Sequence, residues 1–166
     1  MSTSRDLQSA TGIALNLLSF RPRSEAELRE RLNNRFTTDI VNQVISTLIR
    51  QNMVNDYKFA ELWRNNRLSF APRSATRIKQ ELVQKGVASE IAASVIKDVD
   101  DSQTAYCAAL KLAQKSRLSN PDILHRKIQS YLKRRGYTNP VIHSAIVRLH
   151  DEHYYDIEIF DDFERD

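Results

Sequence analysis

The chain has 166 residues, a net charge of +4 at pH 7 and one cysteine, Cys107. A chain of this length buries enough surface to fold without disulfides, and a single cysteine fits a reducing compartment. No stretch has the roughly 20 apolar residues of a membrane-spanning helix, and the polar residues 1–10 do not resemble a signal peptide, so we expect a soluble, cytoplasmic protein. Glycine and proline are scarce, whereas good helix formers are plentiful, which predicts an all-α fold.

The net charge hides two regions of opposite sign. Residues 150–166 contain eight acidic residues and one basic residue, whereas residues 1–149 contain 24 Lys and Arg against 13 Asp and Glu. A basic body indicates an anionic partner, either nucleic acid or an acidic protein surface. The alternative is that surplus Lys and Arg only solvate helix faces. The acidic tail is either a solubility tail or a segment that folds over the basic surface and competes with DNA.

A repeat with an offset of 50 residues organises the chain. The sequence LSFRPRS at 18–24 recurs as LSFAPRS at 68–74, and Leu118-Ser119 begins a third copy. Apolar positions stay in register downstream, for example Leu32, Leu82 and Leu132. Matching apolar positions with divergent surfaces are typical of a duplicated packing unit.

Each copy predicts three short helices. In the first copy a helix through Leu17 is followed by one that Ser24 opens, with Glu27 completing a capping box, and by a third after Thr37 whose apolar face runs to Ile49.

The second copy starts at Asn55-Asp56, a good N-cap pair, and its first helix is predicted to place Phe59, Trp63 and Phe70 on a bulky core face. Ser74 opens the next helix, and Gly86 ends it at a position that favours a positive φ.

The third copy starts at Asp100-Asp101. Pro121 takes the first position of its second helix, Gly136 closes that helix, and Asn139-Pro140 open the last one, which is predicted to end near Leu149.

The predicted fold is therefore all-α, with three tandem three-helix repeats, each resembling a helix-turn-helix unit, stacked as an elongated, curved solenoid. We place the repeats at residues 7–53, 54–99 and 100–149, and the acidic tail at 150–166.

Four segments carry a resemblance to a known family. They are SEAELRERL at 24–32, VNDYKFA at 54–60, RSATRIKQELVQKGV at 73–87 and KIQSYLKRRGY at 127–137. In their order, spacing and threefold repetition, from about residue 10 to residue 149, they resemble the RecX family of bacterial regulators of the RecA recombinase. The acidic tail lies outside the resemblance.

The resemblance implies a function without catalysis. Such proteins bind RecA filaments on DNA and suppress strand exchange, ATP hydrolysis and co-protease activity, and many bind single- or double-stranded DNA directly. The residues agree with a non-enzyme, because the sequence has no glycine-rich phosphate loop, zinc-type spacing or nucleophile elbow. His150 and His153 are better read as a solvated pair than as metal ligands, and Cys107 as a small core residue. We expect no cofactor, no metal, no membrane contact and a monomer.

Basic residues of the second and third copies are the candidate contacts to the filament or DNA. Arg73 and Arg77 stand near a helix N-terminus, where the helix dipole disfavours cations, which favours a role in binding. Basic residues near helix C-termini are explained equally well by the dipole. The candidates are Arg73, Arg77, Lys79, Lys85, Lys111, Lys115, Arg117, Arg126, Lys127, Lys133, Arg134 and Arg135.

Two other functions stay open. A sequence-specific DNA-binding protein would need base-reading side chains where each third helix begins. Those starts read TTD at 37–39, ASE at 88–90 and TNP at 138–140, with no Arg or Gln. The second is a helical adaptor for an unrelated protein.

Overall fold

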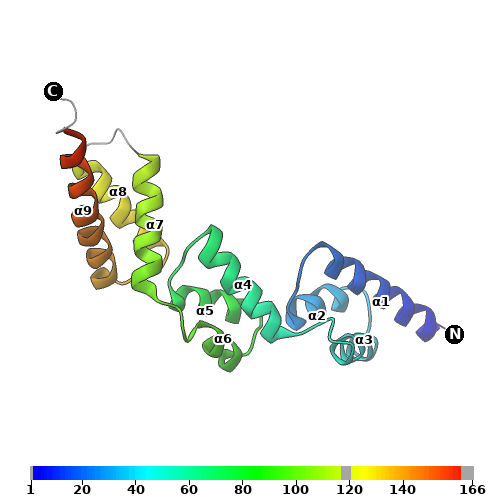
Figure 1. Ribbon diagram of the computed structural model, residues 1–166. Helices are drawn as coiled ribbons and strands as arrows, with labels where there is room; N and C mark the ends of the chain where they lie inside the picture. The colour runs from blue at the N-terminus through cyan, green and yellow to red at the C-terminus, as the bar shows by residue number, and fades with distance from the viewer. Residues whose placement is uncertain (1, 117–120, 162–166) are drawn as a thin grey trace. The chain divides into compact units, whose positions relative to one another are not determined.

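The computed structural model describes the backbone of residues 2–116 and 121–161, and the side chains of residues 4–116 and 122–152. Helices are the only regular secondary structure in this part of the chain (Figure 1). They are α1 (Ser2–Phe20), α2 (Glu25–Asn33), α3 (Thr38–Arg50), α4 (Asp56–Phe70), α5 (Ala75–Gln84), α6 (Ser89–Ile96), α7 (Asp101–Lys115), α8 (Pro121–Arg134) and α9 (Asn139–Asp161). The predicted all-helical repeat fold is confirmed.

The chain divides into two compact units. Unit 1 comprises residues 1–65 and 79–97, and unit 2 comprises residues 66–78 and 98–166. The boundary passes through α4 and α5, so the middle repeat contributes to both units.

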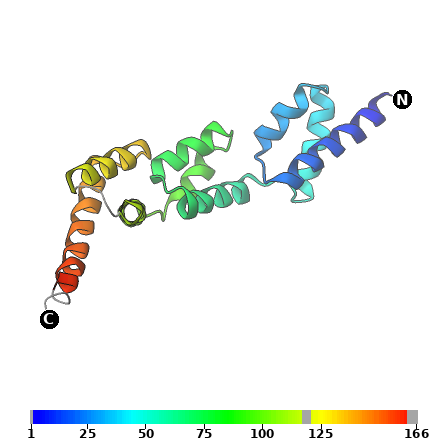
Figure 2. The ribbon, with the colours of Figure 1, turned by 90° about the horizontal axis from the view of Figure 1, so that it is seen from above.

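In unit 1, α1, α2 and α3 pack against one another around one core (Figure 2). Leu28 and Leu32 of α2 lie one turn apart and are fully buried, because side chains four residues apart share a helix face. Ile45 and Leu48 of α3 complete the centre of this core. Phe36, between α2 and α3, is partly buried against it.

The part of the middle repeat that belongs to unit 1 is held by polar contacts from α4. The Trp63 indole Nε1 donates to Glu81 Oε2 of α5 at 2.9 Å. The Arg64 guanidinium donates to the Val95 carbonyl oxygen of α6 at 2.8 Å.

In unit 2, α7 packs against both α8 and α9 (Figure 1). Ala105, Ala108 and Ala109 are buried on α7, and their small side chains let the neighbouring helices approach closely. Ile128 and Leu132 of α8 face this core. Cys107 is a free thiol, half-buried and packed against the same core.

The sequence predicted most helix ends correctly. Ser24 and Glu27 form the complete capping box, and Asn55 Oδ1 accepts from the Lys58 amide at 3.0 Å. Gly86 and Gly136 have φ of +79° and +87°, which residues with a Cβ adopt only at a cost.

Three sequence predictions were wrong. Phe70 is 83% exposed because the core covers only the first turns of α4, where Phe59 is buried, and not its last residue. Ile49 is 43% exposed near the end of α3, beyond the buried part of that helix. The last helix continues past Leu149 to Asp161, so its backbone extends into the acidic tail.

No helix in the described ranges is long and apolar enough to span a bilayer.

Candidate nucleic-acid interface

A serine-capped helix start meets a glycine turn in unit 1, and we name this contact the first junction. It consists of Ser24 and Glu27 at the start of α2 and Lys85 and Gly86 after α5. The Ser24 hydroxyl donates to the Lys85 carbonyl oxygen at 2.6 Å and accepts from the Glu27 amide at 3.2 Å. A Cβ on Gly86 would collide with the Ala26 side chain, so the approach needs glycine as well as its positive φ.

The first junction is electrostatically balanced. Glu27 accepts hydrogen bonds from Lys85 at 2.9 Å and from Arg21 at 3.0 Å, and its side chain is only 16% exposed. Burial alone would raise the pKa of Glu27, but the hydrogen bonds and charges of Arg21 and Lys85 outweigh burial and lower the pKa to about 2. Lys85 also lies 4.4 Å from the centre of the Trp63 ring. Its ammonium group is therefore engaged within the protein and is a poor candidate for an external anion.

The same contact recurs in unit 2, 50 residues later, as the second junction. It consists of Ser74 and Arg77 at the start of α5 and Arg135 and Gly136 after α8. The Ser74 amide donates to the Arg135 carbonyl oxygen at 3.1 Å, and the Ser74 hydroxyl accepts from the Arg77 amide at 3.2 Å. A Cβ on Gly136 would lie 2.8 Å from Ser74 Oγ and 2.9 Å from Arg77 Cβ.

An aspartate at the start of the next repeat's first helix, α4 or α7, supports each junction. Asp56 accepts from the Glu25 amide at 2.8 Å in the first, and Asp101 accepts from the Ala75 amide at 2.7 Å in the second. Burial is the main cause that raises the pKa of both carboxyl groups. No sequence pattern predicts these contacts, because each joins residues 26 to 31 positions apart.

The second junction differs in charge, because Arg77 occupies the position of Glu27. The capping box is then impossible, and the Ser74 amide donates to Arg135 instead of to a glutamate side chain. Arg135 donates to the Pro72 carbonyl oxygen at 3.0 Å and lies 4.2 Å from the centre of the Tyr131 ring. Arg73, Arg77 and the basic run 133–135 are thereby brought together, and we name this group the arginine cluster.

A second group of candidates lies along α7 and α8. Lys127 Nζ of α8 donates to Ser116 Oγ at 3.1 Å, which places Lys127 near Lys115 at the end of α7. Arg126 Nε donates to the Asp122 carbonyl oxygen at 3.3 Å within α8. The candidates of this unit whose side chains are exposed are Arg77, Lys111, Lys115, Arg126, Lys127, Lys133 and Arg134.

The remaining candidates are less favourable or fall elsewhere. Arg73 and Arg135 are half-buried in unit 2, and Lys79 and Lys85 are half-buried in unit 1. Arg117 lies outside the described residues.

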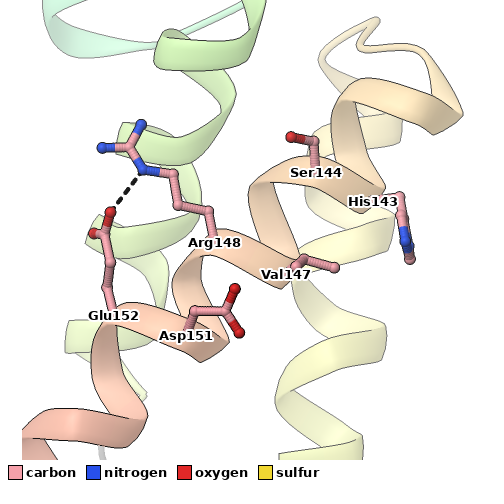
Figure 3. A pocket seen from close by; sticks show the side chains of 6 residues that line it. All are labelled: His143, Ser144, Val147, Arg148, Asp151 and Glu152. Atoms are coloured by element: carbon pink, nitrogen blue, oxygen red, sulfur yellow. Dashed lines mark hydrogen bonds and ion pairs between the residues drawn. The ribbon is translucent and has the colours of Figure 1, made fainter.

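A shallow hollow on the exposed face of α9 contains none of the candidates. Figure 3 shows its six side chains, with the ion pair between Arg148 and Glu152 at 2.7 Å on one flank. Glu152 also accepts a hydrogen bond from the Tyr106 hydroxyl, which fixes the beginning of the acidic tail to α7. Residues lining the hollow are His143, Ser144, Val147, Arg148, Asp151 and Glu152.

Metal binding has no support among the described side chains, which contain no group of three or more His, Cys, Asp and Glu suited to an ion. His153 lies outside those side chains, so the interpretation of His150 and His153 as a solvated pair stays a prediction.

Comparison with known proteins identifies two domains in this arrangement. Residues 10–48 match the family model for the first three-helix domain of RecX, and residues 55–96 match that for the second. A regulatory protein RecX from Clostridioides difficile is 30% identical over 148 residues, which cover 87% of this chain and 69% of that protein. The chain belongs to the RecX family.

Other RecX proteins extend the likeness to most of the chain. The regulatory protein RecX of Listeria welshimeri is 29% identical over 143 residues, but the chain spans only about half of it, 53% of its length. The crystal structure of RecX from Lactobacillus salivarius superposes with a TM-score of 0.72 at 24% identity, covering 88% of this chain and 97% of that one. This last likeness supports the fold.

Proposed function

We propose that this chain regulates a RecA recombinase by binding the filament that the recombinase forms on DNA. Bound there, it mostly lowers strand exchange, ATP hydrolysis and co-protease activity, and so acts in recombination, DNA repair and the SOS response. The observation that carries the proposal is membership of a family whose named members are regulatory proteins. The protein needs no catalytic group for this role, because binding alone changes the state of a polymer.

The charge distribution supports docking onto a nucleoprotein. Residues 1–149 carry a large excess of Lys and Arg, and unit 2 gathers exposed basic side chains from α5, α7 and α8. A filament on DNA presents phosphates and acidic protein surface. Both attract Lys and Arg side chains over distances up to about the Debye length. The filament contact is therefore assigned to unit 2 in this proposal.

The experiment is RecA-catalysed ATP hydrolysis dependent on single-stranded DNA, using the recombinase from the same organism and substoichiometric amounts of the purified chain. We expect a clear fall in the rate, because one small protein per many recombinase subunits acts only through the assembled filament. An unchanged rate would contradict the regulatory proposal. A preparation unfolded by heat is the control for effects of added protein.

A second candidate is direct DNA binding without a recombinase, favoured by the arginine cluster. Helix α3 begins at Thr38, α6 at Ser89 and α9 at Asn139, so the helices that would read bases in a helix-turn-helix protein begin without Arg or Gln. Binding that depends little on sequence and falls steeply with salt is therefore expected. Equal affinity for unrelated oligonucleotides separates this candidate from a sequence-specific regulator.

A further inference from the structure

An exposed phenylalanine recurs at the same place in two repeats. Phe20 is the last residue of α1 and is 78% exposed, and Phe70 is the last residue of α4 and is 83% exposed. A single exposed apolar side chain on a protein surface is ordinary. The repeat places a large aromatic ring at the same exposed helix end twice, 50 residues apart.

The two rings differ in their electrostatic surroundings. Residues 16–28 around Phe20 contain two arginines and two glutamates, and one of those glutamates, Glu27, is the ion-pair partner at the first junction. Residues 66–78 around Phe70 contain three arginines and no acidic residue. The ring at the first junction thus lies in a neutral segment, and the ring at the second junction lies in a strongly basic one.

Tertiary contacts add further positive charge beside Phe70. The Arg135 side chain donates to the Pro72 carbonyl oxygen, two residues after Phe70, and the Arg135 carbonyl oxygen accepts from the Ser74 amide. These two bonds attach the basic run 133–135 to the segment that follows the ring. In the same region, Asp101 of α7 accepts from the Ala75 amide.

We propose that Phe70 is a stacking platform for an unpaired base of single-stranded DNA, with the arginine cluster holding the adjacent phosphates. Proteins that bind single strands combine aromatic rings, which stack on bases, with cations that follow the backbone. Duplex DNA does not offer this contact, because its bases are already stacked on one another. Asn66, Arg67 and Ser69 precede Phe70 in the last turn of α4, so polar residues share this turn with the ring.

This inference deepens the proposed function and rests on it for the source of the strand, which is the DNA inside a recombinase filament. Phe20, at the balanced junction, is not a stacking platform in this scheme. It therefore serves as a matched internal control, since it has the same residue type, helix position and exposure.

The experiment measures binding of the full-length protein to a fluorescent oligothymidylate of about 20 nucleotides by anisotropy, without recombinase. We expect F70A to weaken binding about 5- to 100-fold, which corresponds to the loss of one base-stacking contact. F20A changes the affinity less than about twofold. The salt dependence of F70A equals that of the wild type, because stacking releases no counterions.

Two further probes test stacking directly. An abasic oligonucleotide of the same length should bind wild type and F70A equally, because it has phosphates but no bases. F70W should restore the affinity, and its added tryptophan fluorescence, measured against the Trp63 background, should be quenched by the oligothymidylate. Circular dichroism confirms that each variant is folded.

Unchanged binding of F70A to the oligothymidylate would overturn the inference, and so would a loss of equal size on duplex DNA. If F70A binds recombinase filaments more weakly but binds bare DNA normally, the ring contacts a protein pocket. That result would also overturn the inference. The ATP hydrolysis assay is independent of these results. Loss of oligothymidylate binding in F70A, with no effect of wild type on hydrolysis, would leave the stacking site standing and remove the regulatory function.

Discussion

The two junctions share a serine-to-glycine contact but differ in charge: the first is balanced, and the second has an arginine where the first has a glutamate. In both, a serine at a helix start meets a glycine with positive φ after the second helix of the following repeat. At the first junction Glu27 forms ion pairs with Lys85 and Arg21, whereas at the second junction Arg77 takes the place of Glu27. The serine and the glycine are therefore the same at both junctions, whereas the charged residues beside them differ. The first junction has Glu27 and Lys85 where the second junction has Arg77 and Arg135.

Glycine substitutions should break the shared geometry, with the largest effect at the first junction. G86A should lower the free energy of unfolding by about 2–4 kcal/mol, because it adds backbone strain at a positive φ and a collision with Ala26. G136A should cost about 1–3 kcal/mol, because its Cβ would lie 2.8 Å from Ser74 Oγ and 2.9 Å from Arg77 Cβ, less close than the contact at Gly86. Urea unfolding followed by circular dichroism measures both.

Gly12 provides the control, because a Cβ there meets nothing within 4 Å and the residue is helical. G12A should stabilise the protein by up to about 1 kcal/mol. The double variant A26G/G86A should regain the part of the stability that G86A loses to the collision, but not the part lost to backbone strain. Equal stability of G86A and wild type would contradict the described close approach.

Removing charge from unit 2 should separate the two junctions functionally. Changing Arg73, Arg77, Lys127 and Arg134 together to Ala should weaken binding to DNA and filaments at least about tenfold and flatten the dependence of affinity on salt, since each phosphate contact contributes about −0.9 to the slope. Anisotropy titrations at several salt concentrations measure both quantities.

The matched control removes the same charge from unit 1 by changing the exposed residues Arg5, Arg31, Arg35 and Arg50 to Ala. We expect a much smaller loss of affinity and of slope. If both quadruple variants lose affinity equally, net charge decides binding and the arginine cluster has no special part.

How much of this was predictable depends on the sequence separation of each contact. The 50-residue offset and local capping patterns predicted the helices, the capping box and both positive-φ glycines, because these depend on neighbouring residues. The sequence could not predict that Ser24 bonds to Lys85, a contact across 61 positions. It therefore placed Lys85 among the anion-binding candidates, although Glu27 and Trp63 occupy its ammonium group. It also read Phe70 as core, since periodicity shows which face a residue lies on but not how far the core extends.

The first and third copies each lack one of the two residues that form a junction. In register with Ser24 and Ser74, the third copy has Leu124 inside α8, and in register with Gly86 and Gly136 the first copy has Phe36. Neither end repeat has the residue that another junction would require. Among the described residues, the serine-to-glycine contact is therefore found at the first and second junctions.

The ion pairs of the first junction should make stability depend on pH. Because the pKa of Glu27 is lowered from 4.5 to about 2, its contribution is fully present above pH 4.5 and is lost as the pH falls toward 2. E27Q should cost about 1 kcal/mol at pH 7 and should flatten the decline of stability across this window. Chemical unfolding at a series of pH values measures the difference, and parallel curves for E27Q and wild type would show that Glu27 does not carry it.

Deleting part of the acidic tail should change the affinity for DNA least. If the tail competes with DNA, it does so at the second junction only. Glu152 is bonded to Tyr106 and Arg148, so truncation should begin beyond it, by deleting residues 154–166, which contain six of the acidic residues. If the tail covers the basic surface, deletion should tighten DNA binding a few-fold at low salt, and the gain should vanish at high salt because the attraction is screened. A full-length variant with the same six residues changed to Asn or Gln separates charge from length. Unchanged DNA affinity in both variants would show that the tail serves solubility. If the gain in DNA affinity persists after the arginine cluster is removed, the tail does not compete for that surface.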